Sequence, residues 1–363
     1  MSRLADDALA PRLRAESAPH APQLALLGTG TVGRAFVARY QALQQRRAGL
    51  PAFAWLANSR TRQACLPSAS AHALDAANAA PRGTRAHDLA ADELRRGDVL
   101  VDATASDAVA QWHAQWLARG VHVVTANKLG RGAALERAQQ IEAARHAGAT
   151  HYGDSATVGA GLPLLSSLRA LVAGGDHIHA VEGVLSGSLA WLFHRYDGTQ
   201  AFSDCVREAA AAGYTEPDPR EDLSGEDVRR KLLILARAAG LPLRAEQVQV
   251  ESLLSPALAA AAPGELDAAL STLDAPLAAR LAQASANGAC LRFVGRFDAH
   301  GASVALRALP LGHPLASGAG TDNRVALHSD RYLQQPLLIQ GPGAGAEVTA
   351  AALLDDVLRI AAD

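Results

Sequence analysis

A glycine-rich turn near the start of the chain narrows the choice of fold. An apolar run from Gln23 to Leu27 leads into the sequence GTGTVG, and a stretch with helical periodicity follows. Gly28, Gly30 and Gly33 therefore stand at G-x-G-x-x-G spacing between a predicted strand and a predicted helix. Such glycines allow a tight turn and let the backbone approach a pyrophosphate at the helix N-terminus. A chance glycine turn is the less favoured alternative, because the pattern opens a β/α series.

Two further predicted strands continue this series. Residues 98–103 read DVLVDA and residues 121–128 read VHVVTANK, which is typical of buried parallel strands. Parallel strands place their carboxyl ends at the sheet edge where ligands bind, and a lysine there can polarise or protonate a carbonyl oxygen. The polar residues predicted at this edge are Thr104, Ser106, Asn127 and Lys128. The sequence therefore predicts a Rossmann-type parallel sheet that binds a dinucleotide.

The residues after the second strand, AFAWLA, indicate which dinucleotide is preferred. NAD enzymes usually place an acidic residue there to hold the adenosine ribose, but no Asp or Glu occurs from Ala21 to Leu74. Arg60 and Arg62 lie where a ribose 2′-phosphate needs a cation. We therefore expect NADP(H) to be preferred over NAD(H); the alternative is that both arginines belong to a solvated loop.

An acidic stretch from Gly213 to Lys231, GYTEPDPREDLSGEDVRRK, is the second unusual feature. Two prolines stiffen a loop that is rich in carboxylates. Ser224 followed by Asp227 resembles a capping box at the start of a helix. Asp227 and Lys231 are four residues apart on one face of that helix, so they are expected to pair. The alternative is an ordinary acidic turn with a snorkelling lysine.

The remaining patterns predict a second, α+β domain. Residues 181–196 read as a strand, a serine-rich bend and a helix start, and CLRFVGRFD with ASVALRALP reads as a β-hairpin. The last predicted helix has the period of one that covers a sheet. We expect a disordered tail over 1–21, a nucleotide-binding domain over 22–153, a catalytic and dimerisation domain over 154–335, and a segment over 336–363 that completes the nucleotide-binding domain.

Composition excludes several classes of partner. The formal net charge of the 363 residues is -2 and no basic face is implied, so a nucleic-acid partner is not expected. No apolar run has membrane-spanning length, so no membrane partner is expected either. The three cysteines are widely spaced, which is typical of free thiols and predicts a cytoplasmic location.

Taken together, these motifs resemble the homoserine dehydrogenase family. The segments GTGTVG, TANK, ATVGAGLP, GVLSGSLAWLF, GYTEPDPREDLSGEDVRRKLLILARAAG and GPGAGAEVTAA appear in the family's order from Leu24 onward. The resemblance is strongest to the dehydrogenase portion of bifunctional aspartokinase–homoserine dehydrogenases, although the N-terminal tail is too short for a kinase. It implies the NAD(P)H-dependent, reversible reduction of L-aspartate 4-semialdehyde to L-homoserine, on the route to threonine and methionine.

The resemblance also implies roles for particular residues. Lys128 and Lys231 would flank the aldehyde, and Asp227 would orient Lys231. The implied substrate-binding residues are Glu216, Asp222, Tyr214 and Ser188. The residues expected to bind the cofactor are Gly28, Gly30, Thr31, Val32, Gly33, Arg60, Thr104, Ser106, Asn127 and Gly343.

The chain departs from the family at a monovalent-cation site. Many members carry an acidic residue just before the ATVGAG-like turn, where this chain has Ser155. Asp154 is adjacent, but its side chain is expected to point elsewhere because side chains alternate along an extended backbone. A sodium site on backbone carbonyls near Val158 and Ala160 is left open.

A homodimer through the central domain is expected, because the strand in VEGVLSGSL could extend a sheet across a two-fold axis. Two other functions compete with the one implied by the resemblance. One is a different NADP-dependent semialdehyde or sugar dehydrogenase, and the other is a non-catalytic NADPH-sensing regulator. The first would not need the acidic loop, and the second would not need both lysines.

Overall fold

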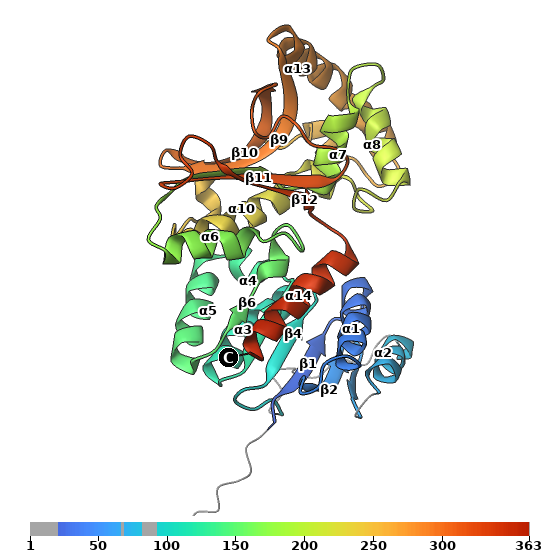
Figure 1. Ribbon diagram of the computed structural model, residues 1–363. Coiled ribbons are helices and arrows are strands. Elements are labelled where there is room, and N and C mark those ends of the chain that lie inside the picture. The colour runs from blue at the N-terminus through green and yellow to red at the C-terminus, as the bar shows by residue number, and fades with distance from the viewer. Residues whose placement is uncertain (1–20, 67–68, 82–92, 363) are drawn as a thin grey trace, which may run out of the picture.

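The computed structural model describes residues 21–66, 69–81 and 93–362, so nearly all of the expected tail lies outside the described residues. The chain forms two lobes, each built on a six-stranded sheet (Figure 1). Within the described ranges, no helix is both long and apolar enough to cross a membrane.

The first sheet confirms the Rossmann-type prediction. Its strand order is β3-β2-β1-β4-β5-β6, and every pair is parallel except the antiparallel pair β2–β3. The predicted strand AFAWLA is β2. The strands are β1 Gln23–Leu27, β2 Ala52–Ala57, β3 Arg62–Ala64, β4 Val99–Asp102, β5 His122–Thr125 and β6 Tyr152–Gly153.

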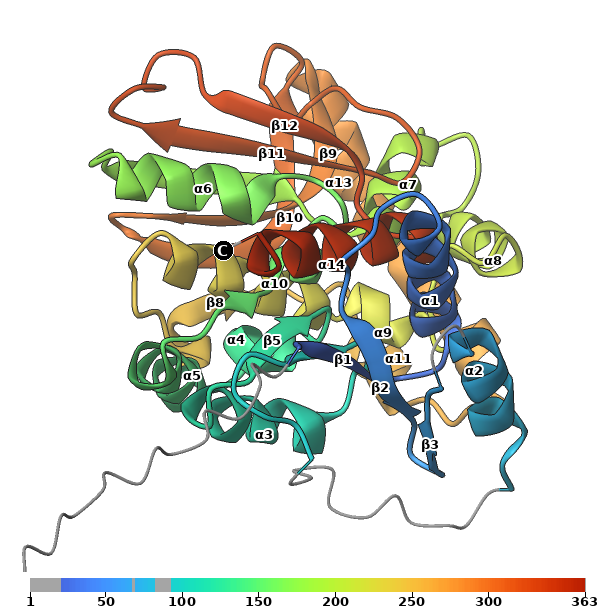
Figure 2. The same ribbon diagram turned by 60° about the horizontal axis from the view of Figure 1, so that its bottom comes forward.

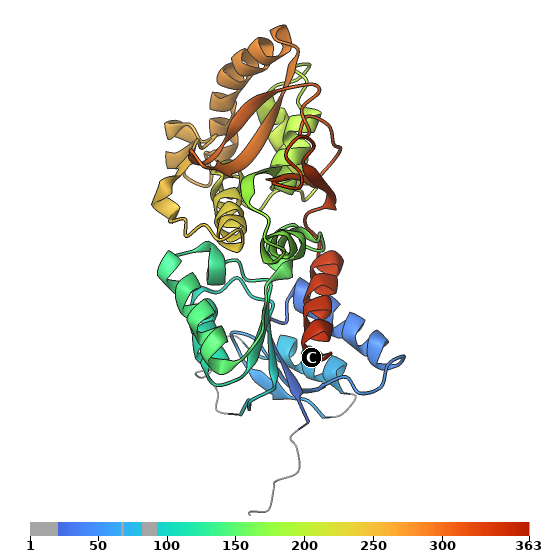
Figure 3. The same cartoon turned by 60° about the vertical axis from the view of Figure 1, so that its left-hand side comes forward.

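Helices cover both faces of this sheet, because alternate residues of each buried strand point to opposite sides. Leu24 and Leu26 of β1 pack with α1 and α14, whereas Ala25 and Leu27 pack with α3 and α5. The C-terminal helix α14 and the helix α5 lie on opposite sides of the sheet (Figure 3). The prediction that the C-terminal helix returns to this lobe is confirmed, since α14 lies beside α1 (Figure 2). The helices of this lobe are α1 Thr31–Gln44, α2 Ser70–Ala79, α3 Asp107–Ala118, α4 Leu129–Gly132, α5 Leu135–Gly148 and α14 Ala346–Ile360.

The second sheet has the order β12-β11-β7-β9-β10-β8. The predicted hairpin is confirmed as the antiparallel pair β9–β10. The expectation that the strand of VEGVLSGSL could extend the sheet is wrong, because β7 is paired on both sides, with β9 and with β11. The strands are β7 Ile178–Val184, β8 Val248–Val250, β9 Ala289–Asp298, β10 Gly301–Pro310, β11 Asp322–Ser329 and β12 Leu337–Pro342.

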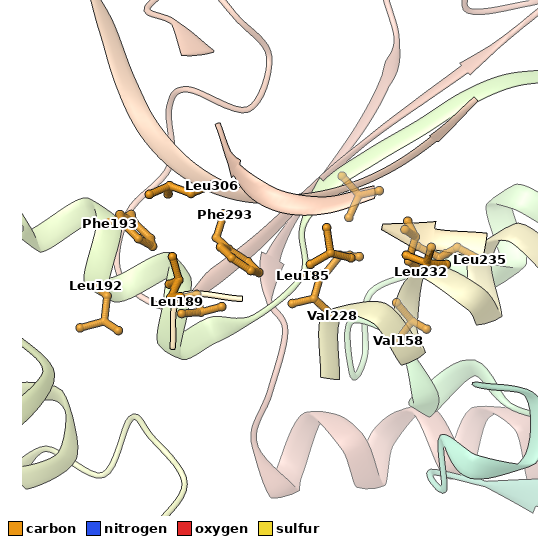
Figure 4. Packing of buried hydrophobic residues seen from close by; sticks show 14 of the residues in the cluster. Val158, Leu185, Leu189, Leu192, Phe193, Val228, Leu232, Leu235, Phe293 and Leu306 are labelled. Atoms are coloured by element: carbon orange, nitrogen blue, oxygen red, sulfur yellow. The ribbon is translucent and has the colours of Figure 1, made fainter. Parts of the chain in front are cut away.

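One face of the second sheet packs on an apolar layer of helices. Leu189 of α7, Val228 and Leu232 of α10 and Phe293 of β9 belong to this core (Figure 4). The elements α4, α6 and α10 lie where the two lobes meet (Figure 1). The helices of this lobe are α6 Leu164–Ala173, α7 Gly187–Arg195, α8 Phe202–Ala211, α9 Arg220–Leu223, α10 Glu226–Ala238, α11 Pro256–Ala260, α12 Leu266–Ala269 and α13 Asp274–Ala286, with 3₁₀ turns η1 Ser155–Thr157, η2 Ala245–Gln247 and η3 Leu270–Leu273.

The predicted capping box at the start of α10 is wrong. Gly225, in the left-handed conformation with a φ of 78°, precedes the helix, and the Ser224 hydroxyl accepts a hydrogen bond from the Glu226 N–H at 3.2 Å. The carboxylate of Asp227 does not turn back to cap the helix, because two lysine ammoniums bind it instead. The helix start therefore places Asp227 in the site.

Candidate functional site

The glycine turn after β1 has the shape that the spacing predicts. Gly28 has a φ of 96°, and a Cβ there would lie 2.7 Å from the Ala103 carbonyl oxygen. A Cβ on Gly33 would lie 1.9 Å from the Gly28 carbonyl oxygen, so only glycine lets α1 pack this closely on β1. Gly30 has open space around it, which leaves room for a ligand. The first N–H groups of α1, at Thr31 and Val32, follow directly and receive no side-chain cap from Gly30, and a helix N-terminus of this kind suits an anion.

The turn after β2 is tied to this glycine turn. The Asn58 side-chain amide donates to the Thr29 hydroxyl at 2.9 Å, and its oxygen accepts from the Arg60 N–H at 2.8 Å. The Arg60 guanidinium donates to the Ala80 carbonyl at 3.2 Å and is half-buried. Arg60 therefore belongs to the same corner of the lobe as the glycine turn.

Arg62 is differently placed from Arg60. It lies in β3, pairs with Glu93 at 2.5 Å and stands over the ring of Trp55. The Arg62 guanidinium therefore already has a carboxylate partner, and its expected contact with a ribose 2′-phosphate stays a prediction.

The polar residues after β4 and β5 lie together at the carboxyl edge, as predicted. The Asn127 side-chain amide donates to the Ser106 carbonyl at 2.9 Å and to the Thr104 hydroxyl at 3.4 Å. The Asn127 side-chain oxygen accepts from the Leu129 N–H at 3.1 Å, which fixes the turn that carries Lys128. The carboxyl edge is thus one hydrogen-bonded unit.

Two lysines from different lobes meet at one carboxylate. The Lys231 ammonium is 2.8 Å from Asp227 Oδ2, and the Lys128 ammonium is 3.3 Å from Asp227 Oδ1. Lys231 also donates to the Leu185 carbonyl at 2.7 Å. The predicted pairing of Asp227 with Lys231 is observed. The contact with Lys128 was not predicted, because it joins segments about a hundred positions apart.

Both lysines lower the pKa of Asp227, but they differ in their exposure to solvent. Burial raises the pKa of the Asp227 carboxyl, but the Lys231 and Lys128 ammoniums outweigh burial and hold that pKa well below its usual range. Asp227 is therefore ionised at neutral pH. Lys231 is only 7% exposed, whereas the Lys128 side chain is 36% exposed and stands at the rim.

The acidic loop is organised by Asp222 rather than by its prolines alone. The Asp222 carboxylate accepts from the Ser188 hydroxyl at 2.6 Å and from the Glu216 N–H at 2.8 Å. The segment from Leu185 to Ser188 therefore touches Lys231 at one end and Asp222 at the other. Ser186 contributes as well, since its hydroxyl lies 2.9 Å from that of Ser188.

Tyr214 and Glu216 stand on the outer side of this loop. Tyr214 is 45% exposed and its ring lies 5.3 Å from that of Trp191, centroid to centroid. The Glu216 side chain is exposed. These two side chains are free to approach a ligand, whereas Asp222 and Ser188 are already bonded to each other.

The expected cation-binding turn has an unusual backbone. Gly159 and Ala160 both have left-handed φ values, 73° and 51°, and Val158 is buried. The Asp154 carboxylate is 2.7 Å from Arg169. The extended backbone expected here is wrong, because Asp154 directly precedes the 3₁₀ turn Ser155–Thr157, so the alternation of side chains does not apply. Among the described residues, no group of three or more His, Cys, Asp or Glu side chains is arranged to hold a metal ion.

Gly343 lies between β12 and α14. A Cβ there would come within 1.8 Å of the Asn323 side-chain oxygen, so packing against Asn323 already requires a glycine. The expected role of Gly343 in cofactor binding stays a prediction.

Comparison with known proteins gives consistent matches. A family model described as homoserine dehydrogenase matches residues 163–358, and one described as homoserine dehydrogenase, NAD binding domain, matches residues 28–153. The chloroplastic bifunctional aspartokinase/homoserine dehydrogenase 2 of Zea mays is 44% identical over 282 residues, which are 77% of this chain and 31% of that protein. This chain thus spans about a third of that relative's length.

Two further relatives match over most of their length. The homoserine dehydrogenase of Schizosaccharomyces pombe is 39% identical over 272 residues, 72% of each chain. A solved structure of a Candida auris protein of unknown function superposes with a TM-score of 0.80 and 33% identity, covering 94% of this chain and 98% of that one.

Proposed function

This chain belongs to the homoserine dehydrogenase family, and on that premise we propose that it reduces L-aspartate 4-semialdehyde reversibly to L-homoserine with a nicotinamide cofactor. One observation carries the proposal. The carboxylate of Asp227 holds an ammonium from each lobe, Lys128 from the nucleotide-binding lobe and Lys231 from the other. Such a pair suits a carbonyl oxygen that gains negative charge during reduction.

The reaction needs a hydride and a proton, and we propose that side chains of this protein supply the proton. A bound nicotinamide would supply the hydride. The ammoniums of Lys128 and Lys231 would stabilise the negative charge that the carbonyl oxygen gains during reduction. One lysine then gives its proton to the oxygen and recovers it from water, which reaches Lys128 at the rim more easily than Lys231. Asp227 reduces the repulsion between the two cations and keeps them together.

The acidic loop is proposed to bind the amino-acid end of the substrate. A carboxylate such as Asp222 or Glu216 binds an ammonium, and the hydroxyls of Ser188 and Tyr214 can bind a carboxylate or an ammonium-bound water. Asp222 is already held by two hydrogen bonds, so it is preorganised for this role. Glu216 and Tyr214, which are exposed, would close on the substrate.

We also propose a preference for NADP(H) over NAD(H). The support is the absence of an acidic residue after β2 and the position of Arg60 beside the glycine turn. A guanidinium suits a ribose 2′-phosphate, which NAD(H) lacks.

A sodium ion on the carbonyls of Val158 and Ala160 remains part of the proposal. Its support is the left-handed conformation of Ala160, a backbone strain in a non-glycine residue of the kind that is often retained for function. Replacing sodium by choline in the buffer should then lower the melting temperature. An unchanged melting temperature would remove the ion from the proposal.

The activity is tested with purified protein, NADPH and two aldehydes. Consumption of NADPH should depend on aspartate semialdehyde and should be far slower with succinate semialdehyde, which lacks the ammonium that the acidic loop is proposed to bind. Equal rates with both would favour a different semialdehyde dehydrogenase. NADPH binding without turnover would favour the non-catalytic regulator.

We propose a homodimer that forms through one face of the second sheet and not through β7. The face of the second sheet that is turned away from the helix layer carries Glu182 paired with Arg296 at 2.8 Å, beside a hollow of about 540 Å³. This face, not an extension of β7, would meet its copy across a two-fold axis. A stable monomer in sedimentation at micromolar concentration would contradict the dimer.

The free thiols of Cys65, Cys205 and Cys290 support a cytoplasmic location.

A further inference from the structure

The short helix α4, which follows Lys128, is held from the side of α10. A Cβ on Gly132 would lie 2.9 Å from the Arg230 carbonyl oxygen, so the two helix backbones are in close contact. Arg237 of α10 donates a hydrogen bond to the Arg131 carbonyl. Because α10 also carries Asp227, any movement of α4 changes the distance between Lys128 and its carboxylate.

The opposite side of α4 rests on a tyrosine hydroxyl. A Cβ on Gly130 would lie 2.2 Å from the hydroxyl oxygen of Tyr152 and 3.1 Å from His113 Nδ1. Gly130 does not have a left-handed φ, so its conformation alone does not require glycine. The close approach of the Tyr152 hydroxyl is what excludes a side chain there.

That hydroxyl is one end of a buried hydrogen-bond chain. Tyr152 Oη is 3.0 Å from His113 Nδ1, and His113 Nε2 is 2.9 Å from Asp102 Oδ2. Asp102 Oδ1 accepts from the Thr104 N–H at 2.8 Å, at the carboxyl edge of the sheet. His113 and Asp102 are fully buried and Tyr152 is 7% exposed.

The direction of the hydrogen bonds follows from the carboxylate at one end of the chain. Asp102 Oδ2 accepts, so His113 Nε2 carries the hydrogen that is donated to it. In the neutral imidazole Nδ1 is then the acceptor, and the Tyr152 hydroxyl, whose pKa burial raises well above its usual range, donates to it. A buried polar chain in which every member is bonded is rigid, because breaking any link leaves an unpaired polar group in the interior.

We infer that Asp102, His113 and Tyr152 form a positioning network that sets the place of α4, and through it the place of Lys128 relative to Asp227. The network extends from the end of β4, through α3 and β6, to the backbone at Gly130. The inference rests on the proposed function, which gives Lys128 its role. Within the described part of the chain, Asp227 pairs with Lys128 and Lys231 and not with any of the three network residues, so these act through the turn that carries Lys128.

The first test compares two tyrosines. Tyr152→Phe removes the hydroxyl that supports Gly130. Tyr40→Phe is the matched control, because Tyr40 is also buried and its hydroxyl donates to the Pro51 carbonyl at 2.8 Å in the same lobe. Both variants lose one buried hydrogen bond, and their melting temperatures should fall by similar amounts. Only Tyr152→Phe should lower kcat, by about tenfold, with a smaller change in the KM for aspartate semialdehyde.

The second test is a double-mutant cycle at Gly130. Gly130→Ala should push α4 away from Tyr152 and lower kcat by roughly 10²-fold. In the Tyr152→Phe background the hydroxyl is absent, and the next atom that the new Cβ would approach is His113 Nδ1 at 3.1 Å. The double variant should therefore have a kcat close to that of Tyr152→Phe alone. Such a strong departure from additivity indicates direct contact between the two positions.

Three results would overturn the network while leaving the proposed function intact. They are a kcat for Tyr152→Phe equal to that of Tyr40→Phe, a Gly130→Ala variant with normal kcat, or additive losses in the cycle. Lys128→Met separates the two proposals. If it abolishes turnover while the network variants behave as the control does, only the network fails. If wild-type protein does not turn over aspartate semialdehyde, the proposed function fails first.

Discussion

Lys231→Met is the substitution that most directly tests the proposed chemistry. Methionine keeps the unbranched length of lysine and removes its charge. The change deletes the ammonium that lies 2.8 Å from Asp227 and 2.7 Å from the Leu185 carbonyl. Lys128 keeps its contact with Asp227, so the carboxylate retains one partner.

The expected losses differ for turnover and for stability. Removing one preorganised partner of a developing oxyanion costs about 10²–10³ in kcat, or roughly 3–4 kcal/mol of transition-state stabilisation. For folding, the Leu185 carbonyl loses its donor, which costs about 1–3 kcal/mol. Methionine offsets part of this loss, because no ammonium has to leave water at this buried position. The variant should therefore remain folded at the assay temperature.

The assay measures NADPH consumption with aspartate semialdehyde and NADPH formation with homoserine. Arg207→Met is the charge-matched control. It removes a cation of the same lobe that pairs at the surface with Asp204 at 2.8 Å and Asp267 at 2.7 Å. The control should retain near-normal turnover. If folded Lys231→Met turns over within about threefold of wild type, the oxyanion argument is wrong, because such a change corresponds to less than about 1 kcal/mol.

Four other substitutions test three separate parts of the site. Arg60→Ala should lower kcat/KM with NADPH by about tenfold or more, the scale of one charge-assisted hydrogen bond, and leave the value with NADH unchanged; equal losses would assign Arg60 a structural role. Glu216→Gln and Asp222→Asn should lower turnover while NADPH affinity, measured by titration, stays normal, and loss of that affinity would place the acidic loop at the cofactor. Asp227→Asn should lower the free energy of unfolding by about 1 kcal/mol at neutral pH, a small value because the Asp227 side chain is 39% exposed. Its folded pKa lies below the unfolded value of about 3.9, so the difference from wild type should be complete above about pH 5 and shrink as the pH falls below about 4; a constant difference in acid denaturation curves would contradict the ion pairing.

Local patterns predicted the elements whose burial is set by nearby residues. The glycine turn before α1, the strand β2 and the hairpin β9–β10 follow from spacing and alternation within a few residues. The three-residue strand β8 lies in an alanine-rich region and was not predicted. It pairs with β10, about fifty positions further along the chain.

Contacts between distant segments were the part that local patterns could not predict. The position of β7 within its sheet depends on β9 and β11, which come more than a hundred residues later. In the site, the i,i+4 spacing predicted the pair Asp227–Lys231, but the Lys128 contact depends on how α4 docks on α10. The spacing from Ser224 had indicated that Asp227 caps the helix α10, but its carboxylate binds the two lysines instead.

On the ribosome, the two lobes cannot mature in the order in which their first residues emerge. Leu24 and Leu26 of β1 appear early, but Leu353 and Val357 of α14, which cover the same face of the sheet, are synthesised after β12. Until then that face of the nascent nucleotide-binding lobe exposes apolar side chains, a state that favours chaperone binding or aggregation. The inserted lobe, which is contiguous in sequence, can complete its core first. The core of the nucleotide-binding lobe is therefore completed only after the whole inserted lobe has been synthesised.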